Sequence, residues 1–471
     1  MKQKIIFFEL NEVPFRILDE FCRWRPDSNL ARLLPRCTQF ETVTEDEGHL
    51  SPWVTWPSLH RGVANSRHGI CEFGQDLNET NREFPPIWQL LARQGVGVGV
   101  FGSMHSYPPE IEGGEFAFYV PDTFAAGSEC FPKQLSAFQE FNLAMVQGSA
   151  RNVSRHIAWK PALSLLARAP FLGLTGRTMF ELGKQIVSEK LEPMRRVRRR
   201  TSQVVLAFDL FMHQLKKHRP AFTTFFTNHV ASSLHRYWAA AFPEDYSENR
   251  YDDQWRAAYG GEIEFTMTWF DRFFGRLVKF VNASQDYRLM IATSMGQEAT
   301  DAKPSSRVLY CTAPDRFMSA LGVAPGDWTS RPAMAPDVCV HVQPAAIDRF
   351  RTNLHALHVE SEPIGIAEKD NGFFRLRFGV APADESRAGC TLHGEQRAAS
   401  DLGLSWIEIE DQTNTNAYHI PQGMLLEYNP HAAAGSARRT QISTLDVAPY
   451  LLRHFGVRTP DYMQRQVLRA A

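Results

Sequence analysis

Short unbroken apolar runs alternate with segments of helical spacing along most of this chain. The run from Lys4 to Leu10 is typical of a strand buried on both faces of a parallel sheet. Gly95 to Phe101, Ala221 to Thr227 and Tyr287 to Thr293 predict further strands, and helical patterns lie between them. This alternation predicts an α/β fold with a doubly wound, mostly parallel sheet.

The segments around these strands complete the predicted core. Helices are expected at Pro86 to Gln94 and Ile263 to Asn282, whereas the polar, aromatic-rich stretch Asn228 to Tyr251 predicts a loop. Met424 to Tyr428 and Ser443 to Phe455 predict a final strand and helix. The α/β pattern therefore returns near the C-terminus.

Two regions interrupt the pattern and predict insertions into the core. Residues 134–218 hold four helical patterns and predict a helical insertion or cap; these are Leu135 to Val146, Pro161 to Ala167, Arg177 to Lys190 and Ser202 to His218. Residues 315–400 hold a short helix near Ala346 to Leu357 and a hairpin turning at Asp370-Asn371-Gly372, and predict a smaller α+β insertion. The predicted organisation is core 1–133, helical insertion 134–218, core 219–314, α+β insertion 315–400 and core 401–471.

Composition narrows the class of protein. A chain of 471 residues, 44% hydrophobic and 22% charged, is ordinary for a globular protein and long enough for one large domain with insertions. The net charge of -1 favours neither nucleic acid nor an anionic membrane as partner. The sequence has no secretory signal pattern and no run of about 18 uncharged apolar residues. Its seven cysteines are scattered without a CxxC pair. We therefore expect a cytoplasmic protein with reduced thiols and no transmembrane segment.

The segment Trp53 to Ile70, W-V-T-W-P-S-L-H-R-G-V-A-N-S-R-H-G-I, is the strongest chemical motif. It predicts a hydroxyl nucleophile, Thr55, at a helix N-terminus, where free N–H groups and the helix dipole favour an anion such as phosphate. A threonine hydroxyl needs a metal ion or a base beside it before it can attack. The alternative is that Thr55 is only the N-cap of the helix, ahead of Pro57.

A basic run from Arg195 to Arg200 lies in the helical region. It predicts either a patch for phosphate or acidic lipid, or an ordinary solvated helix face.

Ligands of open α/β sheets bind beyond the carboxyl ends of the strands, so the polar residues that follow each predicted strand are site candidates. Three groups of such residues follow strands: Glu9, Asn11 and Glu12; Asn228, His229 and His235; and Ser294, Gln297 and Glu298. His419 stands just ahead of the last strand, in Y-H-I-P-Q-G.

Taken in order, these motifs resemble the alkaline phosphatase-like superfamily, and within it the nucleotide pyrophosphatase/type I phosphodiesterase branch. The resemblance rests on T-W-P-S…G…H-G-I, N-H-V-A-S-S-L-H-R-Y-W, T-S-M-G-Q, H-I-P-Q-G and the closing S-T-L-D-V-A-P-Y-L-L-R-H-F-G-V. It covers about residues 1–130, 221–300 and 415–460, and it implies a doubly wound sheet of alkaline phosphatase-like type.

The family holds phosphate between two zinc ions, and the resemblance implies ligands at six protein positions besides the nucleophile. This chain departs from that pattern. Asn11, Asn228 and Met295 stand where the resemblance implies aspartates, and Gly296 stands where it implies a histidine. Amides and thioethers do not offset the charge of two divalent ions, so we expect no complete dinuclear site.

The resemblance then leaves Thr55 as the nucleophile and His235 and His419 as metal ligands. We add Glu9 to the metal candidates, with His229, Glu298 or Asp301 as alternatives, and expect at most one divalent ion, most readily zinc. Asn11, Asn228 and Gln297 are the predicted substrate-binding residues. His49 and His68 are expected to have structural roles.

Two functions follow from this set of residues. The first is a phosphodiesterase or nucleotide pyrophosphatase-like hydrolase, or a phosphotransferase, acting on a small phosphorylated substrate through a phospho-threonine intermediate. The second is a catalytically retired phosphatase fold that binds an anionic ligand or a protein partner. The nucleophile segment and His419 favour the enzyme, and the lost carboxylates favour the retired fold.

Overall fold

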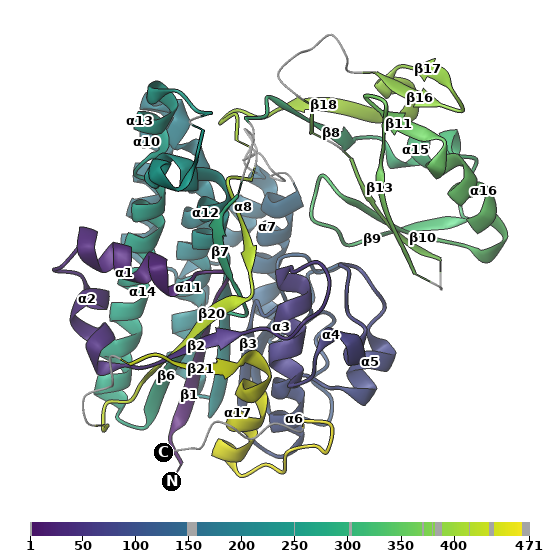
Figure 1. The fold of residues 1–471 in the computed structure, drawn as a ribbon. Coiled ribbons are helices and arrows are strands. Elements are labelled where there is room, and N and C mark those ends of the chain that lie inside the picture. Colours follow the sequence, from purple (N-terminus) through teal and green to yellow (C-terminus); the bar gives the residue numbers. More distant parts are fainter. Residues whose placement is uncertain are drawn as a thin grey trace.

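A computed structural model describes residues 2–147, 158–248, 250–300, 304–369, 372–378, 380–381, 389–413, 415–432 and 438–463. The main sheet contains eight strands, which are β1 (Lys4–Leu10), β2 (Thr38–Val43), β3 (Val98–Phe101), β4 (Phe116–Val120), β5 (Phe222–Thr227), β6 (Tyr287–Ala292), β20 (Gln422–Tyr428) and β21 (Thr440–Ser443). Their order is β21-β2-β20-β6-β1-β5-β3-β4 (Figure 1).

Most neighbours in this sheet are parallel, as the sequence predicts. Strand β1 lies parallel to both β5 and β6, and β3 lies parallel to β4 and β5. Strand β20 is antiparallel to its neighbours β2 and β6. The first strand begins and ends at the predicted residues because its apolar run is unbroken and buried on both faces.

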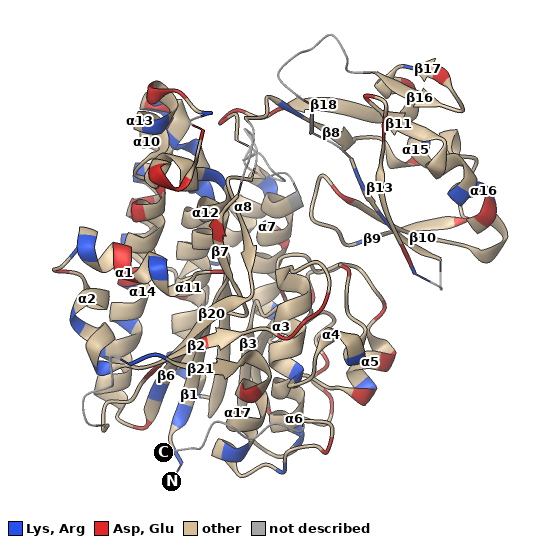
Figure 2. Ribbon diagram, in the orientation of Figure 1, with Lys and Arg blue, Asp and Glu red and all other residues tan. Residues whose placement is uncertain are grey.

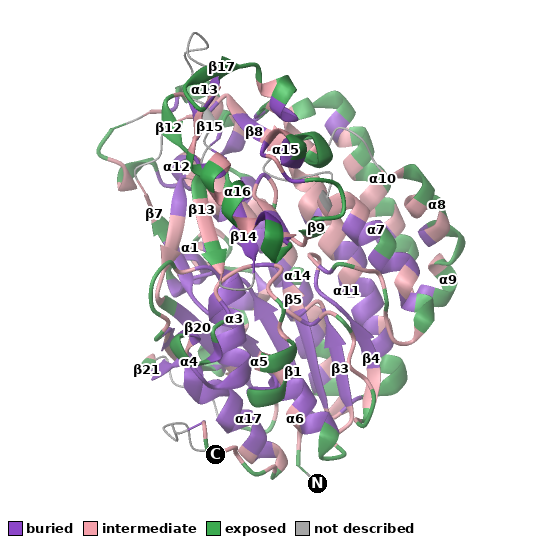
Figure 3. Ribbon diagram, turned by 90° about the vertical axis from the view of Figure 1, so that its right-hand side faces the viewer, coloured by how far each residue is buried: buried purple, intermediate pink, exposed green. Residues whose placement is uncertain are grey.

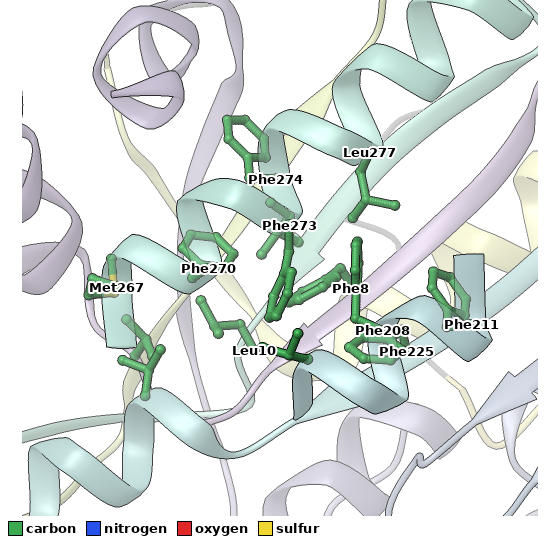
Figure 4. Packing of buried hydrophobic residues seen from close by; sticks show 14 of the residues in the cluster. Phe8, Leu10, Phe208, Phe211, Phe225, Met267, Phe270, Phe273, Phe274 and Leu277 are labelled. Atoms are coloured by element: carbon green, nitrogen blue, oxygen red, sulfur yellow. The ribbon is translucent and has the colours of Figure 1, made fainter. Parts of the chain in front are cut away.

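Helices cover both faces of the sheet. One face packs against α1 (Phe15–Trp24), α11 (Arg199–His218), α12 (His229–Ala241) and α14 (Glu262–Ser284), and the other against α3 (Pro52–Arg61), α6 (Ile87–Arg93) and α17 (Val447–Phe455). Figure 4 shows the aromatic centre of the first face, where Phe8 and Phe225 of the strands meet Phe208 of α11 and Phe270 of α14. The strands are buried along most of their length (Figure 3).

The predicted helical region contains α7 (Ser136–Gln147), α8 (Trp159–Ala167), α9 (Ala169–Leu172), α10 (Gly176–Leu191) and α11. Helix α11 packs directly on the sheet, with the Phe208 and Phe225 ring centroids 5.5 Å apart. Helix α10 lies outside α11, where Thr175 and Thr178 donate hydrogen bonds to Asp209. The helical region therefore supplies one of the helices that cover the main sheet as well as an outer layer.

The prediction of a loop from Asn228 to Tyr251 is wrong, because α12 occupies its first half. Val230, Leu234 and Trp238 recur at i, i+4 and i+8 and are all buried, so they form an apolar stripe facing the core. The polar and aromatic composition of the segment concealed this helical spacing. The helix brings His235 toward the end of the sheet.

Residues 304–408 build a second hydrophobic core of their own around Leu309, Phe350 and Phe374. Its elements are β8 (Arg307–Cys311), α15 (Pro314–Ala320), β9 (Trp328–Arg331), β10 (Val338–Val342), α16 (Pro344–His355), β11 (Leu357–Val359), β12 (Glu362–Pro363), β13 (Gly365–Lys369), β14 (Phe373–Arg377), β15 (Val380–Ala381), β16 (Cys390–Leu392), β17 (Glu395–Arg397) and β18 (Leu404–Glu408). Strands β13 and β14 pair antiparallel as the predicted hairpin requires, although its turn residues 370 and 371 lie outside the described residues. Arg375 of β14 forms an ion pair with Glu72 of the main domain.

The basic run has a structural explanation. Arg195, Arg196, Arg198 and Arg199 pair with Glu192, Glu410, Glu262 and Glu189 respectively. Arg200 is buried, and burial lowers its pKa to about 9. These internal ion pairs favour a structural role for the run over an anion-binding patch. Separately, none of the described helices is both long and apolar enough to cross a bilayer.

Candidate active site

The carboxyl ends of three adjacent strands bring the predicted site residues together. Strand β1 lies between β5 and β6, with Leu10 opposite Thr227 and Glu9 opposite Ala292. Asn11 and Asn228 directly follow their strands, and Asn11 Nδ2 donates a hydrogen bond of 2.8 Å to Asn228 Oδ1. The expectation that polar residues beyond these strands share one edge of the sheet therefore holds for this pair.

Glu12, His235 and His419 form a cluster at this edge. Their three ligand atoms lie within 4.8 Å of one another, and the described part of the chain contains no second such group of His, Cys, Asp or Glu. Glu12 follows β1, His235 projects from α12, and His419 lies on β19 (Ala417–Ile420). Strand β19 pairs antiparallel with β7 (Gly296–Ala299), which places His419 opposite Gln297.

Both histidines present Nε2 to the same carboxylate oxygen. Glu12 Oε2 lies 2.8 Å from His235 Nε2 and 3.2 Å from His419 Nε2. On the far side of each ring, His235 Nδ1 donates to Ala417 O at 2.7 Å and His419 Nδ1 donates to Leu50 O at 2.6 Å. A carbonyl can only accept, so each Nδ1 carries a proton. Each Nε2 faces the Glu12 carboxylate and can become a ligand when a metal ion displaces the proton between them. This is the orientation that metal-binding histidines adopt in proteins, and the residues fit one divalent ion.

Burial and charge attraction act in opposite directions on Glu12 and on His419. Burial by itself would raise the pKa of Glu12, but His419 and His235 outweigh it and hold the pKa well below its usual range. Burial by itself would lower the pKa of His419, but the Glu12 carboxylate raises it overall. Glu12 is therefore the ionised centre of the site, as a metal ligand must be.

Two of the three amides predicted to bind substrate instead hold Glu12 in place. Asn11 Nδ2 donates to Glu12 Oε1 at 2.7 Å as well as to Asn228, and its Oδ1 accepts from Trp56 Nε1. Gln297 Nε2 donates to Glu12 Oε2 and to Ala231 O. Asn228 is different, because it is exposed and its Nδ2 has no partner among the described residues. Of the three amides, Asn228 is the one placed to meet a ligand.

Thr55 lies in the first turn of α3 and is fully buried. The alternative that Thr55 is the N-cap is wrong, because Ser51 is the N-cap and Pro52 begins the helix. The N–H groups of Val54 and Thr55 donate to Ser51 O, so they are not free for an anion. Thr55 Oγ1 lies 2.8 Å from Ser294 Oγ and 3.3 Å from Ser51 O. Within the described residues, neither a carboxylate nor an imidazole bonds this hydroxyl.

Glu9, the predicted carboxylate ligand, lies outside the cluster. Its Oε1 is 2.8 Å from His60 Nε2, and both side chains are fully buried beneath α3. Strand alternation explains the difference, because Glu9 lies within β1 and points to the α3 face, whereas Glu12 follows the strand.

The remaining candidates also lie apart from the cluster. His229 bonds Thr227, and burial lowers its pKa to about 3. Glu298 is exposed, and residue 301 lies outside the described residues. His68 bonds Ser58 and accepts from Ile70 N, which fits the structural role expected of it.

Sequence reasoning missed Glu12 as a ligand and Ser294 as the partner of Thr55. Both follow predicted strands, so the carboxyl-end rule did select them. Of these two residues, only Glu12 has a positive φ, of 56°. A positive φ is uncommon for residues other than glycine, so a glutamate in the sequence gives no sign of it.

Comparisons with known proteins gave structural likenesses only. No family model and no curated protein matches the chain. Among solved structures, murine ectonucleotide pyrophosphatase/phosphodiesterase 5 is similar at 9% identity and a TM-score of 0.41, covering 97% of this chain and 96% of its own. The human protein is similar at 10% identity and a TM-score of 0.40, with the same coverage.

Phosphonoacetate hydrolase from Sinorhizobium meliloti 1021, solved with phosphonoformate, is similar at 13% identity and a TM-score of 0.41, covering 96% of each chain. Identities and TM-scores at this level do not bear on the reaction, so a functional proposal has to rest on the site residues.

Proposed function

We propose that this chain is a phosphodiesterase or nucleotide pyrophosphatase-like hydrolase, or a phosphotransferase, that works with one divalent metal ion. Thr55 is the proposed nucleophile, and Glu12, His235 and His419 are the proposed ligands, with Glu12 in place of Glu9. The observation that carries the proposal is the pair of histidines that turn Nε2 toward one ionised carboxylate.

A bound divalent ion, most readily zinc, would supply positive charge that stabilises a phosphoryl group and favours the ionised hydroxyl. Asn11 and Gln297 orient Glu12, and the backbone carbonyls of Ala417 and Leu50 orient the two histidines. Asn228 Nδ2 is free to donate to a phosphate oxygen. The side chain of His235 is 25% exposed, so a substrate can approach the cluster from this side.

In the proposed reaction, Thr55 Oγ1 forms a bond to phosphorus as the bond to the ester oxygen breaks. The proton lost from the Thr55 hydroxyl ends on the leaving oxygen, which departs as an alcohol. Water or an acceptor alcohol then breaks the phospho-threonine bond and restores the hydroxyl. Ser294 Oγ accepts or donates a hydrogen bond at the attacking oxygen and so fixes its position.

The retired phosphatase fold remains the second candidate, and a specific observation favours it. Thr55 is fully buried and bonded to Ser294 and Ser51, and no carboxylate or imidazole of the described residues bonds its hydroxyl as a general base would. In that case Asn228 and the two histidines would hold an anion without turnover.

Metal content and hydrolysis measured on the same purified protein separate the two candidates. For the enzyme we expect about one zinc per chain and cleavage of bis(p-nitrophenyl) phosphate. Thr55→Ala should lower the cleavage rate by at least about a thousandfold while leaving the zinc in place. Glu12→Gln should lose the zinc and the activity together, because it removes the anionic ligand.

Thr55→Ser is the matched control, since it keeps a hydroxyl at the same position and should retain part of the rate. Sulfate esters tested in parallel separate a phosphatase from a sulfatase. If Thr55→Ala keeps the wild-type rate, the nucleophile is wrong. If the wild type turns over neither ester but binds inorganic phosphate in a way that Asn228→Ala weakens, the retired fold is correct.

A further inference from the structure

The outer helical layer formed by α8, α9 and α10 carries an unusual amount of exposed apolar surface. Ten large hydrophobic side chains are exposed in the described residues, and eight of them lie between residues 159 and 191. These eight are Trp159, Leu163, Leu166, Phe171, Phe180, Ile186, Val187 and Leu191. The three helices lie on the same side of the molecule, away from the main sheet (Figure 3). A concentration of this kind marks an interaction surface.

The exposed apolar residues follow helical spacing, so they form faces and not scattered points. On α10, Phe180, Val187 and Leu191 stand at i, i+7 and i+11, with exposed fractions of 70%, 58% and 77%. On α8, Trp159, Leu163 and Leu166 stand at i, i+4 and i+7. Phe171 of the short α9 between them is 82% exposed. Each helix therefore buries one side on the protein and presents a second apolar side outward.

The exposed basic residues of the same layer outnumber its acidic residues, five to three. Its exposed basic residues are Lys160, Arg168, Arg177, Lys184 and Lys190. Its three acidic residues are paired with arginines outside these helices: Glu181 with Arg272, Glu189 with Arg199 and Glu192 with Arg195. Over the rest of the molecule acidic and basic residues are interspersed (Figure 2). The net charge of -1 for the whole chain conceals this local excess.

We propose that the α8–α10 layer docks on an anionic lipid surface. Amphipathic helices with aromatic and leucine residues on one face and lysine or arginine beside it lie in the plane of a bilayer interface. Trp159 supplies a ring of the type that favours the headgroup level, and Phe171 and Phe180 supply apolar rings for the buried face of such helices. The basic residues complement anionic headgroups, each contributing through attraction that salt weakens.

The same charges disfavour a second copy of this chain as the partner of the α8–α10 layer. A two-fold interface would place the same patch on both subunits, so the five exposed cations would face their own copies. An anionic surface satisfies them, whereas a self-association would leave them repelling one another across an apolar contact. The docking surface is separate from the Glu12 cluster, and its test does not depend on the proposed reaction.

Flotation with lipid vesicles tests the proposal on the full chain. The wild type should float with vesicles of phosphatidylcholine mixed with phosphatidylglycerol, and its binding should fall with added salt and with pure phosphatidylcholine. The triple variant Phe171→Ser/Phe180→Ser/Leu191→Ser should bind at least about tenfold more weakly, because its apolar area no longer enters the interface. Lys184→Glu and Lys190→Glu should each weaken binding about fivefold.

Met334→Ser with Ile407→Ser is the matched apolar control, and Lys216→Glu is the matched charge control. All three positions are exposed but lie outside the layer, so neither variant should change vesicle binding. Thermal unfolding of the triple variant should match the wild type, since the changed side chains are exposed. Vesicle binding that is absent in the wild type, or unchanged in the triple variant, overturns the proposal. A dimer seen by light scattering that the triple variant dissociates would assign the surface to a second copy instead.

Discussion

Glu12 illustrates how one backbone conformation decides the chemistry of a site. A glutamate with φ of 56° is uncommon. Here the chain turns away from the direction of β1 at Glu12, and the carboxylate contacts His235, His419 and Gln297. Glu9, three residues earlier, has the same side chain but faces α3 and pairs with His60. Two identical side chains therefore have different roles because the strand imposes one direction and the turn another.

His68 provides a residue-scale prediction about pH. Burial, with a smaller effect from Arg61, lowers its pKa to about 3, and its Nδ1 accepts from Ile70 N while Nε2 lies 2.8 Å from Ser58 Oγ. Because the folded pKa lies below the unfolded value, the unfolded chain binds more protons as pH falls below about 6.5. His68 should therefore reduce the free energy of unfolding by about 1.4 kcal/mol per pH unit between pH 6 and 4.

The variant His68→Gln should lose this acid sensitivity, and denaturant unfolding at a series of pH values measures it. His431→Gln is the control, because His431 is exposed. An unchanged pH slope in His68→Gln would show that His68 does not titrate as its buried position requires.

At the scale of elements, α12 matters most, because it carries His235 and directly follows Asn228. The residues Arg236 and Tyr237, next to His235, bond the buried Asp411 at 3.0 Å and 2.8 Å. Trp255 of α13 (Asp253–Tyr259) donates to the backbone oxygen of the same aspartate. One buried carboxylate thus anchors the helix that positions a metal ligand.

Asp411→Asn should therefore destabilise the protein by about 3 kcal/mol, because it leaves the largely buried Arg236 side chain, 13% exposed, without its anionic partner. Thermal and denaturant unfolding measure the loss. The zinc affinity should also fall, since the α12 segment around His235 loses an anchor. Asp401→Asn, at an exposed position, is the matched control and should change neither quantity. Equal stability of the two variants would contradict the anchoring role.

At the scale of the whole molecule, the 304–408 unit with its own hydrophobic core contacts the main domain through Arg375. Arg375 of β14 pairs with Glu72, lies 3.2 Å from Asp337, and stacks over Trp53, the neighbour of Val54 in α3. The 304–408 unit therefore rests beside the helix that carries Thr55.

Removing the Arg375–Glu72 ion pair should let the 304–408 unit separate from the main domain more often. Glu72→Ala breaks a charge-assisted contact worth about 1 kcal/mol, so the separated population should rise about fivefold. Limited proteolysis at the connections between the units should accelerate to the same extent, because cleavage follows the open population. Glu79→Ala, at an exposed position nearby, should leave the rate unchanged. Equal cleavage of both variants would show that other contacts hold the units together.

Local patterns predicted most of the fold. The β1 run, the β5 and β6 strands and α14 are long and regular enough for period and burial to specify them. Helix α12 was not predicted, because the polar residues between its apolar positions make the helical spacing hard to recognise. Strands β2 and β21 were not predicted, since their alternating or short patterns carry little signal.

The sequence by itself determined the chemistry available at the site: a threonine in a W-V-T-W-P segment, two histidines and a set of amides where carboxylates are implied by resemblance. Tertiary structure alone decided which carboxylate joins the histidines, which amides are already occupied, and that Thr55 lies bonded to Ser294. The physical reason is that hydrogen bonding and burial join residues far apart in the chain. Glu12 and His419 come together only because β1 and β19 end at the same edge of the fold.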